Sequence, residues 1–446
     1  MKSMTREYKN SDIEWYDSIP FSWKKVKIGW LFNLIASGTT PPSNNNIYYD
    51  GSIPWLNTGD LKDGEIESTT KTITEEAIKE YSTLKLYPKG SLVMAMYGAT
   101  IGKLGITKFE TTTNQACCVM AQPINTNSKF IFYWLMGNRK EIINLSQGGG
   151  QPNINQNIIK NLKLYLPNHD EQQAIAKYLD QKTSEIDSLI ADKEKLIELL
   201  EEKRQAIITE AVTKGLNSNV KMKDSGVEWI GEIPEHWEKL RIKNVASISG
   251  RIGFRGYTTQ DIVDEGNGAI TLSPSNIQNG MMYYDKVTYI SWDKYYESPE
   301  IMLKEGYLIF CKTGSSYGKV AILKDLYEPM TINPQLVVIK PFSILPDYLY
   351  YVLESELGKV QVELIVGGGT MPTINQEDII TMIVTFPPYE EQKQIVEFLN
   401  NKLEEILTTI TDIKLQINKL KEYRQSLIYE AVTGKIDVRE YKKVLS

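Results

Sequence analysis

Two long stretches of the chain carry mostly apolar side chains at alternating spacings of four and three residues. The positions are Ile186, Ile190, Lys193, Ile197, Leu200, Arg204, Ile207 and Ala211 in the first stretch, and Ile406, Ile410, Ile413, Ile417, Leu420, Arg424, Leu427 and Ala431 in the second. This spacing is typical of the seam of a coiled coil. We therefore predict two helices of about 45 residues, each roughly 65–70 Å long given the helical rise per residue.

Shorter apolar runs, broken by Gly, Asn and Pro, precede each long stretch and predict globular parts. LVMAMYG (92–98) and YLIFCKTG (307–314) are typical of buried strands. FIFYWLMG and DYLYYVLESEL each predict one short helix, and LKLYLP and IVTFPP each predict an edge strand that ends at proline. The fold class that follows is α+β, with two α/β domains joined by the two long helices.

The two halves of the chain repeat each other. GGGQPNINQNIIKNLKLYLPNHDEQQAI begins at Gly148, and GGGTMPTINQEDIITMIVTFPPYEEQKQI begins at Gly367. Further upstream, SDIEWYDSIPFSW at Ser11 matches SGVEWIGEIPEHW at Ser225, and YGATIGKLGI matches TGSSYGKVAI. Such self-similarity indicates a tandem duplication of a unit about half the chain long. The glycine runs need positive φ or close backbone approach, and we predict hinges there.

Duplication also constrains how the long helices meet. If the two units pack about a pseudo-two-fold axis, equivalent helices that contact each other run antiparallel, and the product is a rod with a globular head at each end. Alternatively, each helix packs on its own head. The spacing of four and three favours the coiled coil, because a seam needs a long straight partner. The predicted boundaries are 1–168 for the first domain, 169–214 for the central helix, 215–388 for the second domain, and 389–446 for the distal helix and tail.

Composition excludes several classes of site. The chain has three cysteines (Cys117, Cys118 and Cys311) without metal-ligand spacing, and its two histidines (His169 and His236) are too few for a histidine-based metal or acid–base centre. Sparse cysteines, a polar N-terminus and no apolar run long enough to span a bilayer predict a cytoplasmic protein without a membrane partner. The net charge is −6, and the two helical stretches carry most of it, so basic patches remain possible elsewhere.

Two motifs invite a catalytic interpretation and fail the chemistry. YGATIGK has three residues between its glycines and Leu104 after the lysine, whereas a P-loop needs four residues and a Ser or Thr that holds magnesium. FPPY at Phe386 lacks the acidic or amide side chain with which amino-methyltransferases hold an exocyclic amine. The sequence also has no strand–GxGxxG–helix arrangement for a dinucleotide or S-adenosylmethionine. YGATIGK is either a plain hairpin or a turn that places small residues and a cation on an exposed rim.

Matching loops supply the candidate nucleic-acid contacts. WLNTGDLKDG and TLSPSNIQNG occupy equivalent positions and present short amide and hydroxyl side chains, which can contact bases and phosphates. RIGFRG adds two arginines in the second unit only. The alternative for each residue is ordinary turn chemistry. The candidate DNA-binding residues are Asn57, Thr58, Lys62, Tyr97, Thr100, Lys103, Arg251, Arg255, Ser273, Ser275, Asn276, Lys312, Ser315, Ser316 and Lys319.

These features together resemble the specificity subunit of type I restriction–modification systems. The resemblance rests on VKMKDSGVEWIGEIPEHW, on the paired helix starts LPNHDEQQAI and FPPYEEQKQI, and on the paired helix ends RQAIITEAVT and RQSLIYEAVT. It implies two target-recognition domains, each reading one half of a split site in double-stranded DNA. It also implies that the helices separate these domains and dock two modification subunits, which bind S-adenosylmethionine and methylate adenine N6, and that two restriction subunits then join. The chain itself would hold no cofactor, no metal and no catalytic residue.

Two other function classes stay open at this point. A self-contained DNA methyltransferase would need the cofactor loop that the sequence lacks. A protein-only coiled-coil adaptor would use the helices but not the loops. Co-purification distinguishes them, because the resemblance implies two modification subunits and DNA affinity that develops mainly in the complex.

Overall fold

The computed structural model describes residues 6–146, 153–278, 280–366 and 373–439. The two glycine runs, predicted as hinges, lie outside these ranges. The chain divides into two compact units, Met1–Lys193 with Leu415–Ser446 (unit 1) and Glu194–Lys414 (unit 2). Both long helices predicted from the seam are present, as α5 (His169–Lys214) and α11 (Tyr389–Val432), and each contributes residues to both units.

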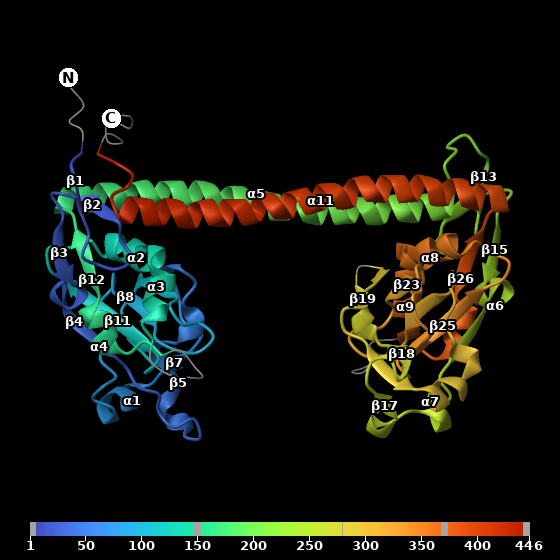
Figure 1. Ribbon diagram of the computed structural model, residues 1–446, viewed down its shortest axis with the longest axis horizontal. Helices are drawn as coiled ribbons and strands as arrows, with labels where there is room; N and C mark the ends of the chain where they lie inside the picture. Colours follow the sequence, from blue (N-terminus) through green and yellow to red (C-terminus); the bar gives the residue numbers. More distant parts are fainter. Residues whose placement is uncertain (1–5, 147–152, 279, 367–372, 440–446) are drawn as a thin grey trace. The chain divides into compact units, whose positions relative to one another are not determined.

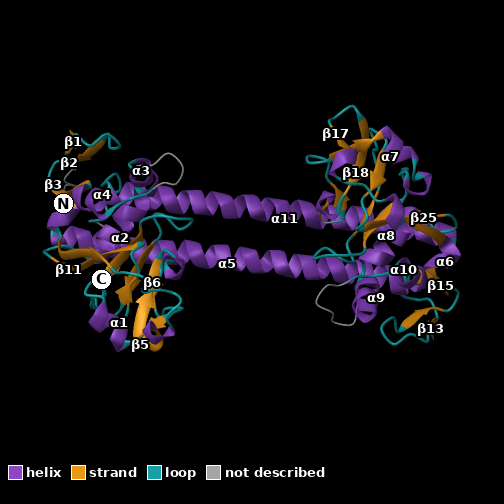
Figure 2. Cartoon of the chain, turned by 90° about the horizontal axis from the view of Figure 1, so that it is seen from below, coloured by secondary structure: helices purple, strands orange, loops and turns teal. Residues whose placement is uncertain are grey.

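Unit 1 is built on a five-stranded sheet in the order β4-β11-β8-β9-β6, with a three-stranded sheet β10-β5-β7 and the pairs β12-β3 and β1-β2. Figure 2 shows α1 beside β5. The elements are β1 (Tyr8–Asn10), β2 (Ser18–Pro20), β3 (Lys24–Lys27), β4 (Phe32–Ser37), β5 (Tyr49–Leu56), β6 (Gly64–Ile66), β7 (Thr72–Ile73), α1 (Glu75–Glu80), β8 (Leu92–Ala95), β9 (Leu104–Thr107), β10 (Thr112–Thr113), β11 (Cys117–Pro123), α2 (Ser128–Gly137), α3 (Arg139–Asn144), α4 (Gln156–Asn161) and β12 (Lys163–Leu166).

Unit 2 repeats this plan with sheets β16-β25-β22-β23 and β17-β21-β18-β24, and with the pairs β15-β26, β13-β14 and β19-β20. Its elements are β13 (Met222–Asp224), β14 (Glu232–Pro234), β15 (Glu238–Arg241), α6 (Ile242–Val245), β16 (Ala246–Gly250), β17 (Ile262–Val263), β18 (Gly268–Leu272), β19 (Ile277–Gln278), β20 (Met281–Met282), β21 (Thr288–Ser291), α7 (Trp292–Tyr296), β22 (Leu308–Cys311), β23 (Val320–Ile322), β24 (Met330–Ile332), β25 (Leu336–Pro341), α8 (Pro346–Glu354), α9 (Glu356–Val366), α10 (Gln376–Thr381) and β26 (Ile383–Phe386).

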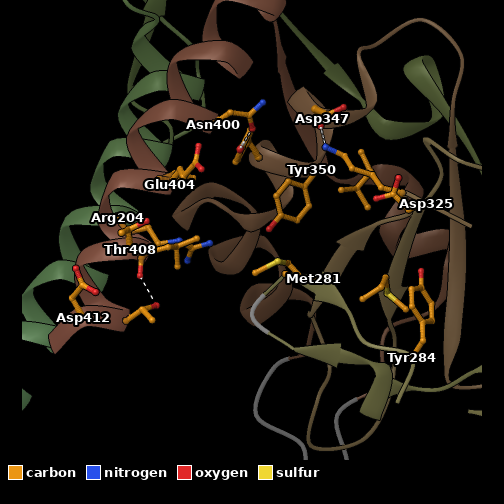
Figure 3. A pocket seen from close by; sticks show the side chains of 18 residues that line it. Arg204, Met281, Tyr284, Asp325, Asp347, Tyr350, Asn400, Glu404, Thr408 and Asp412 are labelled. Atoms are coloured by element: carbon orange, nitrogen blue, oxygen red, sulfur yellow. Dashed lines mark hydrogen bonds and ion pairs between the residues drawn. The ribbon is translucent and has the colours of Figure 1, made fainter. Parts of the chain in front are cut away.

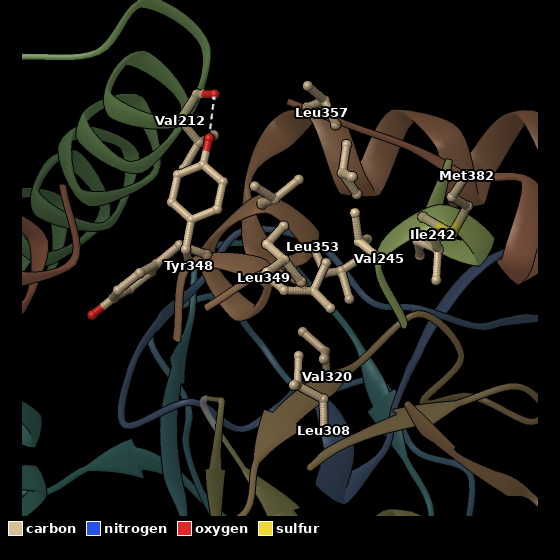
Figure 4. Packing of buried hydrophobic residues seen from close by; sticks show 14 of the residues in the cluster. Val212, Ile242, Val245, Leu308, Val320, Tyr348, Leu349, Leu353, Leu357 and Met382 are labelled. Carbon is tan, nitrogen blue, oxygen red and sulfur yellow. Dashed lines mark hydrogen bonds between the residues drawn. The ribbon is translucent and has the colours of Figure 1, made fainter. Parts of the chain in front are cut away.

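The predicted buried strands LVMAMYG and YLIFCKTG form β8 and β22, whose side chains are buried on both faces. In unit 2 a continuous apolar core joins β22 and β25 to α8 and to the last turns of α5 (Figure 4). Tyr348 of α8 lies in this core, and its hydroxyl donates a hydrogen bond to the carbonyl of Val212 on α5 (3.3 Å). The end of α5 is therefore part of the core of unit 2.

Within unit 1 the two long helices contact each other in antiparallel orientation. Arg424 Nε lies 2.9 Å from Asp187 Oδ1, and Lys193 Nζ donates to Gln416 Oε1 at 2.6 Å. As α5 advances from Asp187 to Lys193, its contact on α11 thus moves back from Arg424 to Gln416. The seam residues Ile186, Ile190, Ile406, Ile410, Ile413 and Ile417 are buried. The antiparallel coiled coil is confirmed, and the helix ends also pack on the globular parts.

The repeated Glu-Gln at the helix starts fastens each globular part to its helix. Gln172 is buried; its Oε1 accepts hydrogen bonds from the Thr126 hydroxyl (3.0 Å) and the Asn127 amide (2.8 Å), while its Nε2 donates to the Pro167 carbonyl (2.9 Å). Gln392 repeats this in unit 2, accepting from the Leu345 amide (2.8 Å) and donating to the Pro387 carbonyl (2.9 Å). The equivalent glutamine thus makes the same kinds of hydrogen bond in both units, which explains why the Glu-Gln motif occurs twice.

The Arg-Gln pair at the helix ends acts similarly. Gln205 Nε2 donates to the carbonyl of Glu354, the last residue of α8, at 2.6 Å. Gln425 Nε2 donates to the carbonyls of Met136 and Gly137 at the end of α2, both at 3.2 Å. Since the last carbonyls of a helix have no partner within the helix, these glutamines cap a helix of each globular part. α2 also lies beside α5 (Figure 1). Tyr133 Oη of α2 donates to Asp180 Oδ1 of α5 at 2.8 Å.

The two ends of the described chain meet in unit 1. Tyr8 Oη donates to the Gly434 carbonyl (3.1 Å), Arg6 Nη1 lies 3.7 Å from Asp437 Oδ1, and Tyr429 Oη donates to the Trp15 carbonyl (3.0 Å). Ile428 and Val432 of α11 are buried, and their side chains contact α2 next to Gly137. Unit 1 is therefore assembled from segments at both ends of the sequence.

None of the helices described here has an apolar stretch of the length that crossing a bilayer requires.

Candidate nucleic-acid interface

In each unit the sheet topology brings the candidate loops to one edge. In unit 1, β5 and β10 are parallel with Leu56 opposite Thr113, so the residues that follow them, Asn57 and Asn114, emerge together. Asn114 Nδ2 donates to Asn57 Oδ1 at 3.1 Å. In unit 2, β18 and β24 are parallel with Leu272 opposite Ile332, so Ser273 and Asn333 emerge together. The duplicated fold thus presents the same pair of strand ends twice.

The YGATIGK motif is the loop of a hairpin between β8 and β9, and TGSSYGK forms the same hairpin between β22 and β23. Both motifs are therefore hairpin loops in their backbone structure. That these residues contact DNA stays a prediction. The glycines that open and close each loop, Gly98, Gly102, Gly314 and Gly318, all have φ near +80°, a region that side chains with a Cβ rarely adopt.

Asp63 ties the two candidate loops of unit 1 together. Its Oδ2 accepts from Lys103 Nζ (2.9 Å) and Arg139 Nη1 (3.1 Å), and its Oδ1 accepts from the Leu104 amide (3.1 Å) and from Arg139 Nη2. Burial raises the pKa of Asp63, but the hydrogen bond from Lys103 and the charge of Arg139 outweigh it, and the net pKa is below its ordinary value. Asp63 is therefore an ionised carboxylate at neutral pH that holds Lys103 in place.

The other candidates of unit 1 lie around this contact. The Asn57 side chain is engaged within the protein, since its Nδ2 donates to the Trp55 carbonyl (3.1 Å). Lys62 is exposed, and Thr58 and Thr100 are half-buried. Tyr97 is half-buried and forms an isolated bridge with Asn153; burial is the main cause that raises the pKa of Tyr97. The loops are adjacent, but only part of the candidate set presents free polar groups.

The two arginines of RIGFRG differ in their surroundings. Arg251 is buried: its Nε donates to the Ile332 carbonyl (3.1 Å), its Nη2 to Thr331 Oγ1 (3.3 Å) and its Nη1 to the Arg255 carbonyl (3.4 Å). Its guanidinium lies over the Tyr257 ring, and burial lowers the pKa of Arg251. Arg255 is half-buried, with Nη1 3.5 Å from Glu300 Oε2. Arg251 is thus placed to hold the loop that carries Arg255.

Hydroxyls dominate the remaining candidates of unit 2. Asn276 is buried, and its Nδ2 donates to the carbonyls of Tyr283 (2.9 Å) and Lys286 (3.1 Å). The hydroxyls of Ser273 and Ser275 lie 2.8 Å apart, and Ser275 is exposed. In the hairpin loop Ser315 and Lys319 are exposed, while Lys312 and Ser316 are half-buried.

Sequence reasoning missed three side chains at these edges, Asp63, Asn114 and Asn333. Asn333 Nδ2 donates to Gln335 Oε1 at 3.2 Å, next to Lys312, whose amide donates to the Gln335 carbonyl at 2.9 Å. A signal was available, because TTTNQ and MTINPQ contain the matching strands β10 and β24, and both place an asparagine directly after the strand. Asp63 gave no comparable signal, since its partners lie far away in the sequence.

A cavity in unit 2 does not suit a polyanion. It measures about 690 Å³ and lies between α8, α11 and the turn after β19. Its lining includes Asp325, Asp347, Glu404 and Asp412 (Figure 3). Lys324 in this lining pairs with Asp347 at 2.6 Å. Uncompensated carboxylates repel phosphates, so the strand-end loops stay the candidate nucleic-acid interface. Across the described ranges, no group of three or more His, Cys, Asp and Glu side chains could hold a metal ion.

Removing the charge of Asp63 is expected to loosen unit 1 in a pH-dependent way. A carboxyl with a lowered folded-state pKa contributes stability above its unfolded pKa and loses it as the pH falls through the folded value. At neutral pH, Asp63→Asn should therefore destabilise the local structure by about 1–2 kcal/mol. The difference from wild type should begin to shrink near the ordinary aspartate pKa of 3.8 and should vanish once the pH is below the lower folded-state pKa of Asp63. Hydrogen exchange at the Leu104 amide, compared between variant and wild type at matched pH, measures this stability difference. A difference that persists in acid would contradict a stabilising role for the Asp63 charge.

Comparison with known proteins agrees with the duplicated architecture. The family model described as the type I restriction modification DNA specificity domain matches twice, at residues 20–199 and 234–419. The specificity subunit of the type I restriction enzyme MjaVIII of Methanocaldococcus jannaschii is 27% identical over 428 residues, covering 94% of each chain. The EcoKI specificity subunit of Escherichia coli K12 is 22% identical over 440 residues, covering 94% of this chain and 90% of the relative.

Solved structures share the fold. A chain from a study of the complex assembly and conformational transition of the type I R-M system has a TM-score of 0.72 at 16% identity, covering 94% of this chain and 99% of that chain. The HsdS subunit from Thermoanaerobacter tengcongensis has a TM-score of 0.52 at 16% identity, covering 95% and 99%. The family matches fall once in each copy of the repeat and together span well over half of the sequence. The chain therefore belongs to the type I restriction–modification DNA specificity family, as a specificity subunit.

Proposed function

We propose that this chain reads a bipartite, asymmetric site in double-stranded DNA, with one half-site for each unit. The observation that carries the proposal is the repetition of one loop framework with different side chains. Asn57, Thr58 and Lys62 in unit 1 correspond to Ser273, Pro274 and Gln278 in unit 2. Two equivalent edges that offer different donors and acceptors can read different base sequences.

The contacts divide by chemistry. We assign base reading to the exposed hydroxyl and amide side chains of the strand-end loops, such as Ser275 and Gln278. Amides pair well with adenine edges, and hydroxyls pair with either base or phosphate. We assign backbone contacts to the exposed lysines, which carry charge without sequence information. Arg251 acts in this proposal through Arg255, whose loop it holds. The two loops of each edge then approach the DNA together.

The chemistry belongs to partner subunits in this proposal. Two modification subunits dock on the long helices, bind S-adenosylmethionine and methylate adenine N6, and two restriction subunits join them. The support lies in the sequence, which has neither a cofactor loop nor an adenine-gripping Pro-Pro motif with an amide or acidic start. The chain itself contributes recognition and assembly, and no catalytic residue.

Radiolabelled methyl transfer tests this division. The purified chain alone is expected to transfer no methyl groups to DNA and to cut none, whereas the chain mixed with its modification subunits is expected to methylate a specific motif. Transfer by the chain alone would favour a self-contained methyltransferase instead. The adaptor alternative predicts that the modification subunits methylate the same motif when the chain is left out, which methylation sequencing of host DNA would detect.

A further inference from the structure

The hairpin loops of the two units are built on the same support. The second loop glycine has a φ of +78° in both, and each packs against the helix that follows α2 or α8. A Cβ on Gly102 would lie 3.0 Å from Arg139 Cγ of α3, and one on Gly318 would lie 3.0 Å from Val362 Cγ1 of α9. The lysines that follow these glycines, Lys103 and Lys319, therefore occupy equivalent positions.

In unit 1 the cations at this position are already paired. Asp63 holds Lys103 at 2.9 Å and Arg139 through both of its terminal nitrogens. Asp63 is largely covered, with 16% of its side chain exposed, so water screens this arrangement only partly. One carboxylate cancels one of the two positive charges and fixes the direction of both side chains.

Unit 2 has two cations at this place without such a carboxylate. Lys319 and Lys359 of α9 are exposed and line the same cavity of about 600 Å³, together with Gln278 and Tyr317. Within the described part of the chain, neither ammonium lies within 4.0 Å of a carboxylate oxygen. The sequence places Asn279, which carries no charge, where the first copy has Asp63.

The acidic residues that line this cavity do not take over the role of Asp63. Glu354 is turned toward α5, where Arg204 Nη2 lies 3.8 Å from its Oε1. Burial is the main cause that raises the pKa of Glu354 above its ordinary value. Glu363, the other carboxylate in the lining, forms no ion pair with either lysine at the same distance limit. The charge of Lys359 acts on Glu354, but the two form no ion pair within 4.0 Å. Among the described residues, neither Lys319 nor Lys359 is thus held by a carboxylate as Lys103 is, and both ammonium groups are available to an external anion.

We propose that Lys319 and Lys359 form a DNA phosphate site on unit 2, and that Asp63 withholds Lys103 and Arg139 of unit 1 from the DNA backbone. This inference rests on the DNA-reading function proposed above. Phosphate contacts release counterions and make affinity depend on salt. The two half-sites should consequently be bound with unequal electrostatic contributions, the larger one from unit 2.

The test uses the full chain assembled with its modification subunits and a duplex carrying the motif found by methylation sequencing. The Kd is measured over a series of salt concentrations, and the slope of log K against log salt is compared among variants. Lys319→Ala and Lys359→Ala should each make this negative slope shallower by about 0.9, the value of one lost phosphate contact. Lys103→Ala should leave the slope unchanged. Asp63→Asn should make the slope steeper, because Lys103 and Arg139 are then released.

Lys89→Ala and Lys304→Ala serve as matched controls. Both lysines are exposed and precede β8 and β22, at the opposite ends of these strands from the hairpin loops, so their loss should not alter the slope. Equal reductions by Lys103→Ala and Lys319→Ala, or no reduction by Lys319→Ala and Lys359→Ala, would overturn the inference while leaving salt-dependent binding intact. If the wild-type complex shows no salt-dependent binding to the duplex, the proposed function itself fails.

Discussion

Replacing residues 21–160 with the matching region of a related specificity subunit is expected to change one half of the methylated motif and leave the other half unchanged. The replaced range contains both candidate loops of unit 1, whereas the loops at 273–280 and 312–319 belong to unit 2. One junction falls between β2 and β3 and the other at the end of α4, so the exchange interrupts no strand. Methylation sequencing of the host gives the result directly.

The reciprocal exchange of residues 235–380 is the matched control, because it spans the equivalent range of the second copy. It should alter only the other half of the motif. If either exchange changed both halves while the complex remained active, the two units would not read independently. An active complex with an unchanged motif would place recognition outside the exchanged loops.

A second large effect is expected from the buried glutamines at the helix starts. Gln392→Ala removes the partners of the Leu345 amide and the Pro387 carbonyl, and Gln172→Ala removes those of Asn127, Thr126 and Pro167. Because buried groups left without partners are costly, each variant should lose about 2–4 kcal/mol. A fall in Tm of about 5–15 °C should accompany it.

Hydrogen exchange localises the damage. Gln392→Ala should expose amides in unit 2 and Gln172→Ala amides in unit 1, since each glutamine bonds only within its own unit. Gln394→Ala and Gln173→Ala are the controls, because these exposed glutamines lie on the same helices a residue or two away. Alanine has the higher helix propensity, so equal losses in control and test variants would mean that the hydrogen bonds of Gln172 and Gln392 are not the cause.

The long helices were predictable because their information is local. Positions such as Ile406, Ile410 and Ile413 recur with the helical period, and no distant contact is needed to recognise them. The doubled motifs were equally visible, and the buried Gln172 and Gln392 now explain why they are doubled. The short strands β8 and β22 could be placed because both faces are apolar.

The arrangement of the site was not predictable in the same way. Asp63, Lys103 and Arg139 come together only because β6 pairs in parallel with β9 and because α3 packs on the hairpin loop. Neither contact has a periodic signal in the sequence. Arg251 illustrates the converse, since a basic residue in a polar loop was predicted to bind DNA and lies buried against the carbonyl of Ile332. Its role at the DNA stays a prediction.

The meeting of the two chain ends in unit 1 has a consequence for synthesis. Every segment of unit 2 leaves the ribosome before residues 415–439, and domains fold as units during synthesis. The nascent chain can therefore complete unit 2 first, while α2 and β1 wait for Ile428, Val432 and Gly434. A product released before the last turns of α11 keeps an open apolar face on α2, which chaperones and proteases recognise. Unit 1 can therefore complete its fold only after the last turns of α11 have been translated.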